Sequence, residues 1–298
     1  MSNSHGLRAY KNIEKLLHLN RSLISEGSRV TLRDLLYGMP HEIFKFKSGQ
    51  KIFDWKIPLE WKVKCGYLSN HQGEKLIDFN VNPLHLAAYS KSVSGFISGQ
   101  ILKEHLFFDN IDEYAIPYRT LYYSNDWAFC VSKKLYDELI QENVSYYVNI
   151  ETEFIDSELE IGEIAFRGKS ETEILFSTYI CHPNLVNNEL SGPVVLRELA
   201  EYLKDKNTYY TYRILFWPET IGSISYIDKF FERLKRNLIA GFVITCIGDD
   251  RNWGYVKTPE ENRLSDKIIR RAFNNLQINF NEFSFLFRGS DERQFCSP

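Results

Sequence analysis

The pattern of apolar residues changes near Glu171, and this change constrains the fold more than any other feature of the sequence. Before it, apolar and polar residues alternate in short runs, as in "EIFKFKSGQKIFDWKIPLEWKV" from Glu42. That alternation is typical of antiparallel strands with one face in water. After it come continuous apolar runs separated by amphipathic helical patterns, beginning with "EILFSTYI" at residues 173–180. Continuous apolar strands are covered on both faces, and strands that alternate with helices favour βαβ units. The sequence therefore predicts an α/β fold with a mainly parallel sheet between helices.

The same pattern divides the chain into an α/β domain with one insertion. Helical spacing over residues 7–38 predicts two N-terminal helices, the second ending near Gly38. After Glu171, strands are expected at 173–180, 209–219, 238–248 and 281–287, with helices at 192–206, 222–236 and 263–276. We therefore expect N-terminal helices within residues 1–50, an inserted β-rich domain over 51–165, and the α/β domain proper over 166–298.

Composition and charge exclude several classes of protein. With 44% hydrophobic and 25% charged residues, the 298-residue chain is globular rather than disordered. A net charge of -3 with no long basic run offers no surface for nucleic acid or anionic membranes. Five cysteines without CxxC spacing form neither a disulfide framework nor a zinc knuckle. The polar N-terminus and the lack of an apolar stretch of about 20 residues predict a soluble cytoplasmic protein.

Polar side chains gather where the expected strands end, which is where open α/β sheets bind their ligands. The stretch "STYICHPNLVNNELSG", residues 177–192, brings a histidine, three asparagines and a glutamate to the first strand end. The candidate site residues at this and later strand ends are His182, Asn184, Asn188, Glu189, Glu219, Asp249, Asp291 and Arg293. Neutral imidazole with carboxylates suits zinc, and a glutamate beside the metal can deprotonate its bound water.

The same residues also fit structural roles. A single histidine after a strand is more often hydrogen-bonded into the structure than bound to a metal, and Glu219 followed by Thr220 also fits a helix cap. Cys181 beside His182 suggests a thiol nucleophile, but adjacent residues on a strand point to opposite faces, which argues against that reading.

Six segments of the chain resemble one family of proteins. They are "RSLISEG", "IFDWKIPLEWKV", "AIPYRTLYY", "STYICHPNLVNNELSG", "PETIGS" and "GSDERQFCSP". Their order and spacing resemble the aminopeptidase-like proteins that accompany bacterial polysaccharide-biosynthesis genes. That group is similar in turn to the co-catalytic zinc aminopeptidases. The resemblance implies a sheet sandwiched by helices, with the β-rich middle of the chain as a small inserted domain.

The resemblance also implies site roles. The implied roles are metal ligand for His182, Glu189 and Asp249, general base for Glu219, and substrate-binding or supporting residue for Asn184, Asn188, Asp291 and Arg293. Asn188, Thr220 and Thr245 stand where the zinc aminopeptidases carry carboxylate ligands. The family's C-terminal part, with its last metal-binding histidine, is expected beyond Pro298, which leaves 166–298 incomplete. We therefore expect at most one zinc ion, weakly held.

Two functions from different classes follow from the resemblance. The first is a zinc-dependent hydrolase of aminopeptidase type that acts on a peptide or an amide-containing small molecule, linked to surface-polysaccharide biosynthesis. An amide bond in an acylated sugar is a variant of the same chemistry. The second is a non-catalytic descendant whose pocket binds a glycan precursor or a protein partner. The ligand-type residues that remain favour the enzyme, and the exchanged carboxylates favour the binding module.

Overall fold

The structure is a computed structural model that describes residues 2–139, 144–286 and 289–296, and it divides into two compact units. The first unit comprises Met1–Pro58 with Ser157–Pro298, and the second comprises Leu59–Asp156. Residues 51–58 and 157–165, which the alternating pattern assigned to the insertion, thus belong to the first unit. Alternation identifies a strand but does not say which of two sheets the strand joins.

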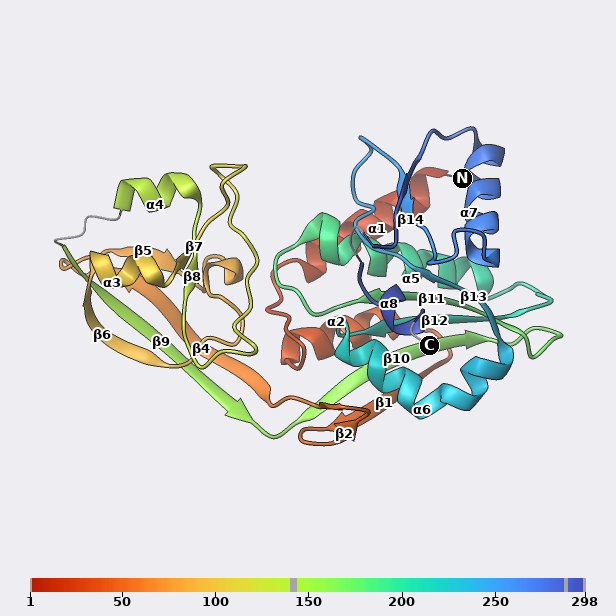
Figure 1. The fold of residues 1–298 in the computed structure, drawn as a ribbon, viewed down its shortest axis with the longest axis horizontal. Coiled ribbons are helices and arrows are strands. Elements are labelled where there is room, and N and C mark those ends of the chain that lie inside the picture. The colour runs from red at the N-terminus through yellow and green to blue at the C-terminus, as the bar shows by residue number, and fades with distance from the viewer. Residues whose placement is uncertain (1, 140–143, 287–288, 297–298) are drawn as a thin grey trace. The chain divides into compact units, whose positions relative to one another are not determined.

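The first unit is built on a five-stranded sheet (Figure 1). Its strands, in spatial order, are β1 (His41–Lys47), β10 (Glu158–Phe166), β12 (Thr211–Trp217), β11 (Glu173–Tyr179) and β13 (Leu238–Val243). β11 is parallel to β12 and to β13, as the βαβ pattern predicts. β10 is antiparallel to both β1 and β12. The sheet is therefore mixed, and the prediction of a mainly parallel sheet holds only for the three strands that follow Glu171.

Helices cover both faces of this sheet (Figure 1). They are α2 (Glu26–Leu36), α5 (Ser191–Leu203) and α6 (Ile221–Asn237), and α1 (Ser2–Leu16) packs against α5. On one face Ile214 and Phe216 of β12 pack in a cluster with residues of α2 and α5. On the other face Leu215 and Trp217 pack with residues of α6. Because successive side chains of β12 enter opposite cores, the strand is apolar at every position from Ile214 onward.

The last part of the unit departs from the expected order. Helix α7 (Leu264–Leu276) contacts β13, but the strand expected at 281–287 forms only as β15 (Asn281–Phe283). β15 pairs with β14 (Gly254–Val256) in a separate parallel two-stranded sheet, and its residues are exposed. Residue 287 lies outside the described residues. The short helix α8 (Glu292–Phe295) follows and contacts α6.

The second unit contains a four-stranded antiparallel sheet. Its strands, in spatial order, are β5 (Lys75–Asp78), β4 (Glu60–Ser69), β9 (Ser145–Ile155) and β6 (Val93–Ser98). The remaining elements of the unit are η1 (Pro83–His85), α3 (Gly99–Glu104), β7 (Leu106–Phe107), β8 (Phe129–Cys130) and α4 (Lys133–Leu139). A two-residue hairpin, β2 (Lys51–Ile52) with β3 (Trp55–Lys56), belongs to the first unit. Among the described residues, no helix is both long and apolar enough to cross a membrane.

Gly192 allows the first turn of α5 to lie directly against the end of β13. A Cβ at this position would overlap the backbone oxygen of Ile244 and the hydroxyl of Thr178. A backbone atom cannot move aside as the end of a flexible side chain can. The tight approach brings the residues just before α5 back over the end of β11.

We expect Gly192→Ala to lower the free energy of unfolding by about 1–3 kcal/mol, the usual cost of forcing an extra carbon into a packed site. Gly6→Ala is the matched control, because Gly6 lies in α1 with open space around its Cα. It should leave stability unchanged or raise it by roughly 0.5–1 kcal/mol, since alanine favours a helix. Urea unfolding of both variants measures the difference. Equal stabilities would contradict the role given to Gly192.

Candidate active site

The segment that follows β11 folds back on itself before α5 begins. Asn184 takes a left-handed backbone conformation with φ of 52°, which asparagine tolerates better than most residues. A π-helical turn, η2 (Val186–Leu190), then leads into α5. Such turns are rare and occur frequently at functional sites. The fold-back places Glu189, which is completely buried, against His182.

Glu189 holds His182 at two points. One carboxylate oxygen, Oε1, accepts a hydrogen bond from the backbone N–H of His182 at 2.9 Å. The other oxygen, Oε2, accepts a hydrogen bond from the ring nitrogen Nδ1 at 2.6 Å. His182 itself is only 9% exposed. Burial disfavours a charge on its ring, but the sulfur of Cys181 and the carboxylate of Glu189 raise the pKa of His182 well above its ordinary value. The orientation of the imidazole is therefore fixed by a buried carboxylate.

Glu219 lies on the opposite side of the same ring. Its Oε2 is 3.5 Å from Nε2 of His182, and its other oxygen accepts a hydrogen bond from the hydroxyl of Ser290. The backbone N–H of Glu219 donates to the sulfur of Cys181 at 3.2 Å. Three segments of the chain thus converge, from the ends of β11 and β12 and from the loop before α8.

Asp291 fixes the strained turn that carries Glu219. Thr220, the next residue, has φ of 64° and ψ of -70°, a conformation that β-branched residues avoid. Its backbone N–H donates to Oδ1 of Asp291 at 2.7 Å, as does the Ser223 hydroxyl at 2.8 Å. Trp217 Nε1 donates to Oδ2 at 2.8 Å. Burial raises the pKa of Asp291 to about 7, although these three hydrogen bonds oppose the rise.

Cys181 is a buried thiol rather than a nucleophile. Burial raises its pKa to about 11, so the thiolate is scarce at neutral pH. Its sulfur nevertheless lies 3.7 Å from Nδ1 of His182. The alternation of side chains along a strand did not predict this approach, because both residues lie beyond the end of β11.

Two atom pairs test whether a zinc ion fits this group. Ligand atoms of Cys181, His182 and Glu189 all lie within 4.8 Å of one another. Two nitrogen or oxygen ligands about 2.0–2.1 Å from a tetrahedral ion stand roughly 3.4 Å apart. The 2.6 Å between His182 Nδ1 and Glu189 is too short for such a pair and is a hydrogen bond. Nε2 lies 3.5 Å from Glu219, farther than a short hydrogen bond, and is the ring nitrogen that can accept an ion. The donor set therefore fits one ion beside Nε2, with Glu189 as the carboxylate that orients the histidine.

Asn188 and Thr245, at two of the other expected ligand positions, are hydrogen-bonded to each other and to their neighbours. The Thr245 hydroxyl pairs with the Tyr179 hydroxyl at 2.5 Å and donates to the backbone oxygen of Asn188 at 3.0 Å. The amide of Asn188 lies 3.6 Å from the sulfur of Cys246. These neutral groups, of which the Tyr179 ring lies 5.2 Å from the His182 ring, form a polar cluster rather than a second set of anionic ligands.

Asp249 and Arg293 make their contacts elsewhere. Asp249 accepts from Asn187 at 3.2 Å and pairs with Arg251 at 3.1 Å, and its hydrogen bonds from Arg251 hold the pKa of Asp249 below its ordinary value. Arg293 donates to the backbone oxygen of Phe285 at 2.7 Å. The structure thus brings together His182, Glu189 and Glu219, with Asp291 behind them. It shows no contact of Asp249 or Arg293 with that group within the described ranges.

Arg21 is a member of the site that the residue patterns did not single out. It is 1% exposed, and its side chain lies 3.8 Å from the carboxylate of Glu189. The segment "RSLISEG" was one of the six that carry the family resemblance, but nothing in its spacing connects it with a histidine 161 positions later. Only the packing of the loop after α1 against the end of β11 shows the connection.

The high pKa of Asp291 predicts a pH-dependent stability. Since its folded-state pKa of about 7 exceeds the ordinary value of 3.8, the native protein keeps a proton that the unfolded chain releases. The raised pKa contributes on the order of 4 kcal/mol to the free energy of unfolding. This contribution is complete below about pH 4 and is lost as the pH rises to 7. Urea unfolding between pH 4.5 and 8 should show this fall in the wild type and a weaker one in Asp291→Asn. The exposed Asp228→Asn is the control, and equal slopes in all three proteins would contradict the assignment.

Comparisons with known proteins agree with the fold. A family model described as a domain of unknown function, DUF4910, matches residues 10–298. A Clostridium acetobutylicum protein, described as a candidate polysaccharide biosynthesis protein with an aminopeptidase-like domain, is 38% identical over 297 residues. That match covers 100% of this chain and 68% of the relative.

Solved structures show the same relationship. The crystal structure of a candidate peptidase from Clostridium acetobutylicum is 38% identical, with a TM-score of 0.93, and the match covers 100% of this chain and 69% of that one. A zinc aminopeptidase from Bacillus subtilis is 14% identical, with a TM-score of 0.62 over 93% of this chain and 78% of that one, which shows a shared fold alone. The chain therefore belongs to the DUF4910 family, and its first unit has the fold of the zinc aminopeptidases.

Proposed function

We propose that this chain is a metal-dependent hydrolase of aminopeptidase type that acts on a peptide or amide bond. The observation that carries the proposal is the position of Glu219, 3.5 Å from Nε2 of a histidine whose other ring nitrogen binds a buried carboxylate. Metal-dependent hydrolysis uses such an oriented imidazole beside a second carboxylate. The description of the Clostridium acetobutylicum relative supports a link with polysaccharide biosynthesis.

Each residue of the group has a distinct role in this proposal. His182 would hold one zinc ion through Nε2, and a bound ion would supply polarisation of the substrate carbonyl. Glu219 accepts the proton of the attacking water. The Ser290 hydroxyl and the Cys181 sulfur hold the side chain and the backbone of Glu219 in place. Glu189 keeps the Nδ1 side of the imidazole occupied, so that Nε2 is the nitrogen offered to the ion.

The ion is weakly held in this proposal. A catalytic zinc normally has about three protein ligands, whereas this group offers it the imidazole of His182 and keeps Glu219, 3.5 Å from Nε2, as the base. Asn188 and Thr245, which stand at expected ligand positions, are neutral and hydrogen-bonded to their neighbours. Any further ligand to the ion would come from water, and this set of residues offers no anionic ligand for a second ion.

The polar cluster of Tyr179, Thr245 and Asn188 favours a second candidate function. Hydroxyl and amide groups at Thr245, Tyr179 and Asn188 suit a ligand rich in hydroxyls better than they suit cations. In that case the chain is a non-catalytic binding module for a glycan precursor. The two functions differ in their need for zinc and for Glu219.

Glu219→Gln and His182→Ala separate the roles. We expect the wild type to bind about one zinc ion and His182→Ala to bind none, because the imidazole is the ligand least replaceable by water. Glu219→Gln should bind zinc within about threefold of the wild type, while turnover of an aminoacyl anilide falls at least 100-fold, as for loss of a general base. Calorimetric zinc titration and the anilide assay measure the two quantities. Glu232→Gln, an exposed position on α6, is the matched control.

Two results would count against the proposal. If the wild type binds no zinc and hydrolyses no aminoacyl anilide, the binding-module function is favoured. If Glu219→Gln loses zinc affinity in step with turnover, Glu219 is a metal ligand rather than the base.

A further inference from the structure

Arg21 lies in the loop between α1 and α2, and its guanidinium is buried beside the candidate metal site. Nε donates to the backbone oxygen of His182 at 3.0 Å, and Nη1 donates to the backbone oxygen of Leu16 at 2.6 Å. Nε also lies 3.8 Å from Oε1 of Glu189. We propose that Arg21 is a positioning residue that orients His182, by binding its backbone and by supplying the counter-charge to Glu189. The inference rests on the proposed function of His182 as a metal ligand.

Packing alone does not account for an arginine at this position. Its side chain is 0% exposed, and burial lowers the pKa of Arg21 against the opposing effect of Glu189. The third nitrogen, Nη2, is buried and has no hydrogen-bond partner in the part of the chain that the structure describes. An apolar side chain of similar length would fill the same space without the desolvation of a cation. The charge therefore acts on something, and Glu189 is the carboxylate beside it.

The contacts hold His182 from three directions. Glu189 accepts its backbone N–H and its ring nitrogen, and Arg21 donates to its backbone oxygen. With both backbone groups and the ring fixed, the direction of Nε2 toward Glu219 is set by the surrounding groups. Partners of this kind, which contact a ligand rather than the metal, typically change metal affinity 10–100-fold when they are removed.

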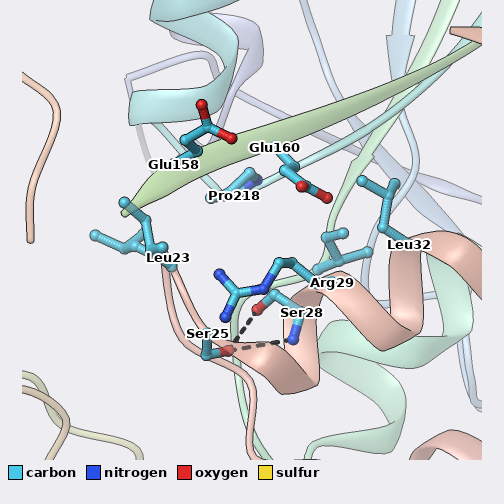
Figure 2. A pocket seen from close by; sticks show the side chains of 10 residues that line it. Leu23, Ser25, Ser28, Arg29, Leu32, Glu158, Glu160 and Pro218 are labelled. Carbon is cyan, nitrogen blue, oxygen red and sulfur yellow. Dashed lines mark hydrogen bonds between the residues drawn. The ribbon is translucent and has the colours of Figure 1, made fainter. Parts of the chain in front are cut away.

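The serines that follow Arg21 hold its loop in shape. Ser28 donates to the backbone oxygen of Ser22 at 2.6 Å, and Ser22 donates to that of Ile24 at 3.0 Å. Figure 2 shows Ser25 joined to the hydroxyl and the backbone nitrogen of Ser28 where α2 begins. The pocket in that figure contains none of the candidate site residues. The segment "RSLISEG" is thus a braced loop that presents Arg21 to Glu189.

Arg213 provides a matched control within the same unit. Its side chain is 13% exposed, and the guanidinium pairs with two buried carboxylates, Glu163 and Glu173, the latter at 2.7 Å. These residues lie on β10, β11 and β12, and their ion pairs and hydrogen bonds within the described part of the chain do not include His182. Removal of Arg213 thus reports the loss of a buried cation without a change at the site.

The experiment compares Arg21→Met, Arg21→Lys and Arg213→Met in the full chain. Calorimetric titration with zinc chloride should show binding at least tenfold weaker in Arg21→Met. Arg213→Met should bind zinc within about twofold of the wild type, although it is less stable. Arg21→Lys should bind zinc with an affinity between those of the other two variants, because its ammonium cannot donate to the backbone oxygens of both Leu16 and His182. Wild-type zinc affinity in Arg21→Met would overturn the inference.

A metal-free measurement separates this inference from the proposed function. Nitrogen-15 spectra of labelled histidine, with the His182 ring assigned by His182→Ala, report the hydrogen bond from Nδ1 to Glu189. The ring signals should shift in Arg21→Met and stay unchanged in Arg213→Met, even if the wild type binds no zinc. Unchanged signals in Arg21→Met would overturn the positioning role. If Arg21→Met does not fold, Arg21→Lys decides by the same two measurements.

Discussion

The hydrogen-bonded pair of His182 and Glu189 is the interaction on which the site depends. Its two side chains are seven residues apart, and they meet only because the chain reverses through Asn184 and a π-helical turn. Both side chains are buried. Away from water, a hydrogen bond to a carboxylate is strong and an unpaired carboxylate is costly. The close approach at Gly192 maintains this reversal. The first strand end therefore presents a fixed imidazole rather than a mobile one.

Buried carboxylates organise each loop of the site in the same way. Glu189 binds a backbone N–H and the ring of His182, while Asp291 binds a backbone N–H beside Glu219 together with two side chains. Glu189 thus joins η2 to the residues after β11, and Asp291 joins the loop before α8 to the turn before α6. Rigid support of this kind is what a site needs to hold its reactive atoms at a fixed separation. The second strand end accepts a strained Thr220 because Asp291 holds it.

The sequence predicted β11, β12 and β13 and the helices after Glu171 because their apolar periodicity reflects burial in the core, but the strand expected at 281–287 forms only as the exposed β15. It also indicated His182, Glu189 and Glu219, since residues at parallel strand ends share one edge of the sheet. It did not predict that β10 joins that sheet, because alternation alone cannot assign a strand to one of two sheets. Arg21 was beyond prediction for a similar reason: a contact across 161 positions depends on tertiary packing, which leaves no local pattern. Asp249 followed a strand end as the others do, but its loop turns it toward Arg251.

We propose that this fold holds one metal ion on Nε2 of His182, with Glu219 beside it as the base. Anomalous X-ray scattering at the zinc edge, from crystals of the full chain soaked in zinc, tests it most directly. We expect one peak, about 2 Å from Nε2 of His182, with Nδ1 still bound to Glu189. Two peaks, or a peak on the Nδ1 side among Cys181 and Glu189, would contradict it, as would no peak at His182.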